Sequence, residues 1–346
     1  MSALLTRLGI ELPIVQAPMA GSQGAALAIA VAEAGGLGSL PCALLAPDAM
    51  RRELAAIRTA TSRPVNVNFF CHQMPEPDAE REAAWRRALR PYYDECGLDP
   101  EPGPAGPPRL AFDEAALDVV REFRPGVVSF HFGLPSAPLL AAVKALGVTV
   151  MASATTVDEA RWLEAHGVDA VIAQGVEAGG HRGMFLTTDL TTQVGTMALV
   201  AQVVDAVRVP VVAAGGIADA RGVTAALVLG ASAVQVGTAY LLCPEATTSR
   251  VHRAALEGGA ASHTSLTNVF TGRPARGMVN RLIRELGPMH AGAPAFPLAA
   301  DAVTPLRALA EAHGSGDFSP LWAGQNVSGC RNMPAGALTR ALAGLR

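Results

Sequence analysis

A strand-and-helix alternation repeats eight times along this chain of 346 residues. Short runs rich in β-branched and small apolar residues end in Gly, Pro or polar residues, and a helical pattern follows each of them. The predicted strands are 14–17, 37–40, 65–69, 127–132, 148–152, 170–173, 209–213 and 233–236. Eight such α/β units predict a (β/α)8 TIM barrel. A doubly wound open sheet is the alternative, but no strand is followed by the GxGxxG pattern of a dinucleotide site on such a sheet.

Residues 72–108 fall outside this repeat and predict an insertion after the third strand. The segment begins Pro-rich, becomes charged and helical over 78–90, and turns rich in Pro and Gly over 100–108. In a barrel the loops after the strands form the active face, so this insertion is expected to cover a site there.

Residues 244–324 also fall outside the repeat and predict a helical cap subdomain after strand eight. Helical patterns at its ends and centre, broken by Gly and Pro, occupy residues 245–256, 276–285 and 304–312. The expected organisation is therefore a cofactor-binding barrel at 1–243, the cap at 244–324 and a C-terminal segment at 325–346 that returns to the barrel.

Charge and cysteine usage exclude several classes of protein. The formal net charge of −3 gives no basic field for nucleic acid. Five cysteines form no CxxC pair and their number is odd, which argues against a disulfide framework and a structural zinc site and favours the reducing cytoplasm. The N-terminus lacks the pattern of a signal peptide, and the uncharged stretch 223–243 is divided by Gly230 and carries Gln235, so we expect no membrane span.

The residues at the predicted strand ends exclude several barrel chemistries. No lysine occurs there, which argues against a Schiff-base aldolase, and the absence of an HxH pair or an acidic cluster argues against a metal site. Amides, glycines, hydroxyls and one or two histidines remain. Such residues bind a polar planar molecule but have little reactivity, so an organic cofactor is expected to supply the chemistry.

Glycines at neighbouring strand ends indicate where a phosphate binds. Gly215 and Gly216 follow the seventh predicted strand, while Gly237 and Thr238 follow the eighth. Barrels commonly bind phosphate at these two strands through backbone N–H groups, which glycine lets an anion approach closely. Since Gly179-Gly180-His181 could add further donors, a phosphate that carries a flat ring, most simply FMN, fits the pattern.

Period-two alternation predicts which side chains face the barrel interior. On strand 127–132, Ser129 and His131 share the inner face, while Val128, Phe130 and Phe132 are expected to pack on the helices. The same count directs Asn66, Asn68, Gln235 and Gly237 inward on their strands. His131 is the candidate for catalysis, although a histidine in an apolar run is more often a core residue.

Other candidates keep more than one interpretation. His181 could face substrate, contact phosphate or cap its loop, and Met19 could line a flavin edge or fill the core. Asn68 and Gln174 could contact a ring edge or bond loop backbone. Three arginines could attract an anionic substrate, but as common surface residues they are assigned no role: Arg182, Arg273 and Arg276.

Several of these segments together resemble the nitronate monooxygenase family, formerly called 2-nitropropane dioxygenases, in the class with a catalytic histidine. The resemblance covers nearly the whole chain. Residues 174–183 (QGVEAGGHRG), 213–217 (AAGGI) and 129–135 (SFHFGLP) are among the matching segments. Within them 177–181 (EAGGH) and 214–217 (AGGI) also resemble flavin-dependent enoyl-ACP reductases, whereas 129–135 is particular to the nitronate enzymes. Further matching segments are 16–21 (QAPMAG), 152–156 (ASATT), 235–238 (QVGT) and 322–325 (WAGQ).

The resemblance implies a TIM barrel that holds FMN noncovalently and uses O2 to oxidise alkyl nitronates, such as propionate 3-nitronate, to a carbonyl compound and nitrite. It makes His131 the catalytic residue, with His181 and Ser153 in the substrate pocket. The expected FMN-binding residues are Met19, Ala20, Asn68, Gln174, Gly179, Gly180, Gly215, Gly216, Gln235, Val236, Gly237 and Thr238. An FMN-dependent NAD(P)H:quinone or enoyl-thioester reductase on the same scaffold is the alternative function. The partners are small molecules, and the sequence leaves open whether the chain forms a homodimer.

Overall fold

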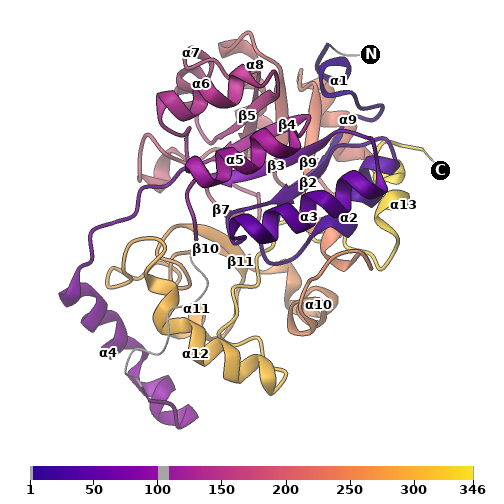
Figure 1. Cartoon of the computed structure of the whole chain (residues 1–346). Coiled ribbons are helices and arrows are strands. Elements are labelled where there is room, and N and C mark those ends of the chain that lie inside the picture. The colour runs from indigo at the N-terminus through magenta and orange to yellow at the C-terminus, as the bar shows by residue number, and fades with distance from the viewer. Residues whose placement is uncertain (1–2, 100–108, 346) are drawn as a thin grey trace.

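Eight parallel strands form the central sheet of the computed structural model, which describes residues 3–99 and 109–345 (Figure 1). The strands are β1 (Ile14–Gln16), β2 (Gly38–Pro41), β3 (Val65–Phe70), β4 (Val127–His131), β5 (Thr149–Ala154), β6 (Ala170–Gln174), β8 (Val211–Ala214) and β9 (Ala233–Val236). Their order is β1-β9-β8-β6-β5-β4-β3-β2. A parallel bridge between Val15 and Leu37 joins the two edge strands, and the Leu37 N–H donates to Ile14 O at 2.8 Å. The predicted (β/α)8 TIM barrel is confirmed.

Helices cover the outside of the barrel and leave its strands buried on both faces, as expected for a parallel sheet. They are α2 (Ala25–Glu33), α3 (Pro47–Ala60), α5 (Glu114–Phe123), α6 (Ala137–Ala145), α7 (Val157–Ala165), α8 (Thr196–Ala206), α9 (Ala220–Val228) and α13 (Ala335–Leu342). Side-chain caps define several starts: the Asp113 carboxylate accepts from Ala116 N, and the Thr156 hydroxyl accepts from Glu159 N. α1 (Ala3–Leu8) contributes its leucines to the apolar cluster inside the barrel.

The insertion after β3 packs on the cap. Its helix α4 (Ala79–Cys96) lies beside α12 (Ala299–Ala312), away from the barrel (Figure 1). Trp85 Nε1 donates to Ala299 O at 3.1 Å, and the Tyr93 hydroxyl donates to Ala302 O at 2.6 Å. The insertion and the cap therefore share one apolar cluster. The Pro- and Gly-rich end predicted at residues 100–108 lies outside the described residues.

The cap contains strands as well as helices. Its helices are α10 (Arg250–Glu257), α11 (Arg281–Leu286) and α12, and a three-stranded antiparallel sheet joins β10 (Thr264–Thr267), β11 (Ala275–Met278) and β7 (Gly180–His181). Short 3-10 helices occupy Leu190–Thr192, Thr238–Leu242 and Gly259–Ser262. The helix predicted over 276–285 is wrong at its start, because residues 275–278 pair with β10 on one side and β7 on the other.

Within the described residues no helix combines the length and the apolar character needed to cross a bilayer. The uncharged stretch 223–243 instead divides into part of α9, the strand β9 and a 3-10 helix, as its internal glycine predicts.

Candidate active site

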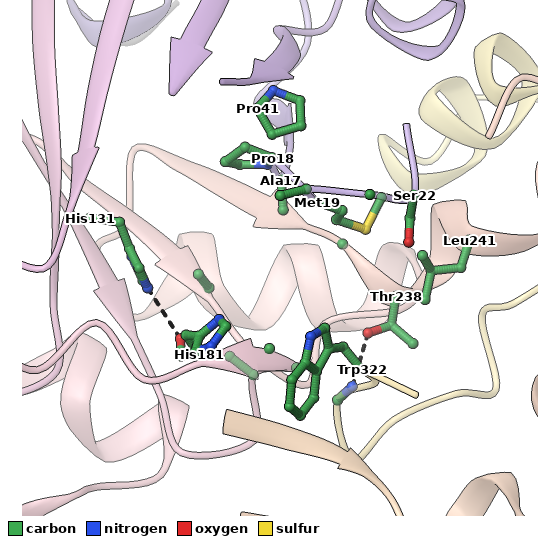
Figure 2. A pocket seen from close by; sticks show the side chains of 18 of the residues that line it. Ala17, Pro18, Met19, Ser22, Pro41, His131, His181, Thr238, Leu241 and Trp322 are labelled. Atoms are coloured by element: carbon green, nitrogen blue, oxygen red, sulfur yellow. Dashed lines mark hydrogen bonds between the residues drawn. The ribbon is translucent and has the colours of Figure 1, made fainter. Parts of the chain in front are cut away.

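A cavity of about 280 Å³ opens at the carboxyl ends of the barrel strands, with residues of the cap on its opposite side. Figure 2 shows Ala17, Pro18 and Met19 on one side of it and His181 and Trp322 on the other. Except for Val236, every predicted site residue lines this cavity: Met19, Ala20, Asn68, His131, Ser153, Gln174, Gly179, Gly180, His181, Gly215, Gly216, Gln235, Gly237 and Thr238.

Val236 lies in the hydrophobic core, where its side chain is 1% exposed. Alternation along β9 explains this position, because Gln235 points into the barrel and its neighbour must then point outward. The Val236 carbonyl accepts from Ala17 N at 2.8 Å. The Val236 side chain is therefore structural, and the assignment of this residue to FMN binding stays a prediction.

His131 ends β4, and its ring points across the cavity toward the His181 backbone (Figure 2). His131 Nδ1 lies 3.0 Å from Ser153 Oγ, and Nε2 lies 3.2 Å from His181 O. Burial lowers the pKa of His131 to about 3, and the charges of Arg273 and Arg182 act in the same direction. The imidazole is therefore neutral at neutral pH and available for hydrogen bonding.

Phe132 does not pack on the helices as the alternation predicts. Its backbone has φ of 70°, so the strand geometry ends at His131 and the next side chain turns toward the mouth of the barrel. There the Phe132 ring packs against Phe70 and Phe296, and the Arg273 guanidinium lies 4.0 Å above its centre. Phe130 does join the outer core, as predicted.

Gln174 connects the end of β6 to the loop that carries His181. Its side-chain Nε2 donates to His181 O at 3.0 Å, and its Oε1 accepts from Gly183 N at 2.8 Å. His181 Nε2 lies 2.9 Å from Thr271 Oγ1, and burial lowers the pKa of His181 well below its usual value. Gln174 therefore fixes the carbonyl that His131 faces.

Arg182 is a buried structural residue, which corrects its assignment to the surface. It is fully buried and its guanidinium donates to Gln174 O and Gly175 O, both at 2.7 Å, and to Gln193 Oε1 at 2.9 Å. Arg276 is also buried and donates to Val176 O at 2.8 Å. These two cations hold the backbone of the loop after β6 from behind the cavity.

Two further arginines line the cavity, and sequence reasoning missed both. Arg109 follows the insertion and Arg307 belongs to α12, so no local pattern relates them. Burial lowers the pKa of Arg109, the nearby charge of Arg307 lowers it further, and Asp301 opposes the shift. The Arg109 side chain has no hydrogen-bond or ion-pair partner among the described residues, so this wall favours an anion.

The lining residues fit a flavin. Gln235 lines the cavity, and its Oε1 is buried without a hydrogen-bond partner within the described residues. This oxygen is therefore available to accept a hydrogen bond from the polar ring of a ligand. Gly216 has φ of 69°, and a Cβ at Gly237 would lie 3.3 Å from Ala17 Cβ. These glycines keep the wall open to a phosphate at the strand ends where it is expected.

Lowering the pH is expected to destabilise the protein through His131. In the unfolded chain a histidine has a pKa of about 6.5 and binds a proton that buried His131 does not, so stability falls as the pH drops below that value. The contribution is about 2 kcal/mol at pH 5. Between pH 7 and 5 the free energy of unfolding, measured by denaturant titration, should fall less in His131→Asn than in wild type. In the control variant His166→Asn, at an exposed histidine, it should fall as much as in wild type. Equal losses in all three proteins would contradict this.

The barrel, the loop glycines and the buried imidazole define a TIM-barrel enzyme of the cofactor-binding type, and comparison with known proteins gives its family. The family model described as "Nitronate monooxygenase" matches residues 1–343. The chain is 45% identical to the nitronate monooxygenase of Pseudomonas aeruginosa over 97% of this chain and 96% of the relative. It is 43% identical to that of Paraburkholderia phytofirmans over 98% and 93%. The chain therefore belongs to the nitronate monooxygenase family and is an oxidoreductase; this family is flavin-dependent.

Solved structures agree with this assignment. A nitroalkane oxidase from Streptomyces ansochromogenes superposes with a TM-score of 0.90 at 42% identity, covering 99% of this chain and 97% of the other. FabK from Thermotoga maritima superposes with a TM-score of 0.74 at 28% identity, covering 99% and 94%. The greater similarity lies with the nitroalkane enzyme.

Among residues 3–99 and 109–345 no group of three or more His, Cys, Asp or Glu side chains could hold a metal ion.

Proposed function

We propose that this protein binds FMN noncovalently in the cavity and oxidises small alkyl nitronates with O2 to a carbonyl compound and nitrite. The observation that carries the proposal is a neutral imidazole at the mouth of a barrel whose cavity is lined by amides, glycines and Arg109, an arginine without a side-chain partner among residues 3–99 and 109–345. Such a lining binds and orients polar groups but performs no redox chemistry of its own.

Each part of the lining has a distinct role in this proposal. Gly215, Gly216, Gly237 and Thr238 would hold the phosphate, while the amides of Asn68, Gln174 and Gln235 would contact the ring edge. When bound, FMN supplies the electron-transfer chemistry. His131 contacts the nitro group of the substrate, either as its hydrogen-bond partner or as the base that removes the α-proton of a neutral nitroalkane. The loop of His181 and the cap residue Trp322 cover the substrate from the opposite side.

Arg109 and Arg307, the two arginines that line the cavity, favour substrates with a second negative charge, such as propionate 3-nitronate. Arg109→Met is expected to raise KM for this carboxylate about tenfold, because it removes a charge-assisted hydrogen bond. Initial rates with ethyl nitronate, which has no carboxylate, should change little in the same variant. Arg161→Met, at an exposed arginine, is the matched control. Equal effects on both substrates would show that Arg109 does not bind the carboxylate.

Oxygen uptake and nitrite release with propionate 3-nitronate and simple alkyl nitronates, after a visible spectrum for flavin, test the proposal. A colourless protein that takes up no FMN would overturn it. Steady NAD(P)H consumption with no nitrite release would instead favour the quinone or enoyl-thioester reductase, which the similarity to FabK keeps as the second candidate. A yellow protein inert to both substrate classes would be a flavin-binding protein without turnover.

The cellular setting belongs to the same proposal. All five cysteines are free, which suits the reducing cytoplasm expected from the sequence. The proposed partners are the nitronate and O2, and a homodimer remains an expectation that size-exclusion chromatography with light scattering can test.

A further inference from the structure

We infer that Ser153 is a positioning residue for His131, whose Nδ1 it holds so that the Nε2–H group points to the substrate. The sequence places Ser153 in the substrate pocket as a contact residue. This inference rests on the proposed function, and of the two roles considered there for His131 it supports the hydrogen-bond partner of the nitro group, because an Nε2–H group cannot act as a base. It assigns Ser153 to the histidine and not to the substrate.

The hydrogen bonds of His131 determine which nitrogen carries the proton. The His181 carbonyl, 3.2 Å from Nε2, can only accept, so Nε2 must carry the hydrogen. A neutral imidazole has one N–H group, and burial keeps this ring neutral. Nδ1 is therefore an acceptor, and the Ser153 hydroxyl, 3.0 Å away, is the donor.

The barrel brings these two side chains together and leaves them little freedom. Phe130 on β4 is paired with Ala152 on β5, so the next residues along the two adjacent strands, His131 and Ser153, lie at the same level. Gly183 packs over both: a Cβ there would lie 2.8 Å from His131 Cε1 and 3.1 Å from Ser153 Cβ. Ser153 is 5% exposed, so its hydroxyl depends on His131 as a partner more than on solvent.

The two ring nitrogens of His131 therefore have different roles. Nδ1, which carries the lone pair, accepts a hydrogen bond from Ser153, while Nε2, which faces the cavity, donates one. A nitronate oxygen in the cavity would share the Nε2–H group with the fixed His181 carbonyl, in a three-centre hydrogen bond. Losing the serine hydroxyl would leave Nδ1 without a donor and the ring free to change its tautomer or tilt.

Nitrogen NMR of histidine-labelled protein tests this hydrogen bond without reference to turnover. We expect the wild-type spectrum to show His131 protonated at Nε2 and bare at Nδ1, with the signals assigned by their loss in His131→Asn. In Ser153→Ala the Nδ1 signal should move toward that of a nitrogen without a donor. The control variant is Ser39→Ala, which removes another buried hydroxyl. The Ser39 hydroxyl donates to Gln16 O outside the cavity, so its loss should leave the His131 signals unchanged.

Kinetics of the FMN-loaded protein test the consequence. Ser153→Ala should lower kcat with an alkyl nitronate about tenfold at unchanged FMN content, and Ser153→Thr, which keeps a hydroxyl, should recover most of it. Wild-type His131 protonated at Nδ1, or an Nδ1 signal and kcat that Ser153→Ala leaves unchanged, would overturn the inference. A wild-type protein that oxidises no nitronate would overturn the proposed function instead, while the spectra still decide the hydrogen bond.

Discussion

His131→Ala is expected to lower nitronate turnover by about 10²-fold or more while FMN remains bound. The ring contacts Ser153 and the His181 carbonyl, and none of the glycines proposed to hold the phosphate depends on it. Its loss should therefore remove the group that contacts the nitro function and leave the cofactor-binding wall in place. The measurement is nitrite release and oxygen uptake per bound flavin, with flavin content read from the visible spectrum.

The control for this prediction is His166→Ala. His166 is exposed at the end of α7, where it stacks on Trp162 at a ring separation of 3.7 Å, and it is not one of the residues that line the cavity. Turnover should be unchanged in this variant. If His131→Ala, fully loaded with flavin, turned over at the wild-type rate, His131 would have no part in the mechanism.

The second large effect is expected for Arg182→Leu, which should both destabilise the fold and weaken FMN binding. The substitution removes the guanidinium donor from Gln174 O and from Gly175 O, of which Gly175 O still accepts from Ala178 N at 3.1 Å. It also leaves the nearby charges of Glu159 and Glu177 less compensated. The cost is roughly 3 kcal/mol. We expect the melting temperature to fall by roughly 5 °C and the purified protein to carry less flavin.

Two variants sharpen the test at Arg182. Arg182→Lys keeps the charge but cannot donate to both carbonyls in the same fork, so it should fall between wild type and leucine. Arg221→Leu removes an arginine whose side chain is 91% exposed and should leave both the melting temperature and the flavin content unchanged. A wild-type melting temperature in Arg182→Leu would show that the loop after β6 does not need this cation.

Much of the site could be predicted because it follows from position along the strands. The carboxyl ends of parallel strands meet at one mouth, so Asn68, Gln174 and Gln235 had to converge once the strands were recognised. Alternation correctly directed His131 inward, and it also implies that Val236 points outward, although the motif had placed that residue in the site. The prediction failed at Phe132, where a left-handed backbone conformation ended the alternation.

The cap shows the limit of local patterns. Residues 275–278 form a strand because β10 and β7, far apart in the sequence, supply its partners on both sides. Arg109 likewise lines the cavity near Arg307 of α12, which lies almost 200 residues further along the chain. No periodicity in the flanking residues carries that information.

The amino-acid order alone determined the barrel and the end of it that carries the site, because hydrophobic periodicity and strand-terminal glycines are properties of neighbouring residues. Only the folded chain decided that Arg182 is buried, that Arg109 lines the cavity and that Ser153 lies within hydrogen-bond distance of His131. The burial of a side chain and its hydrogen-bond partners are determined by segments that are far apart in the sequence and packed together in the fold.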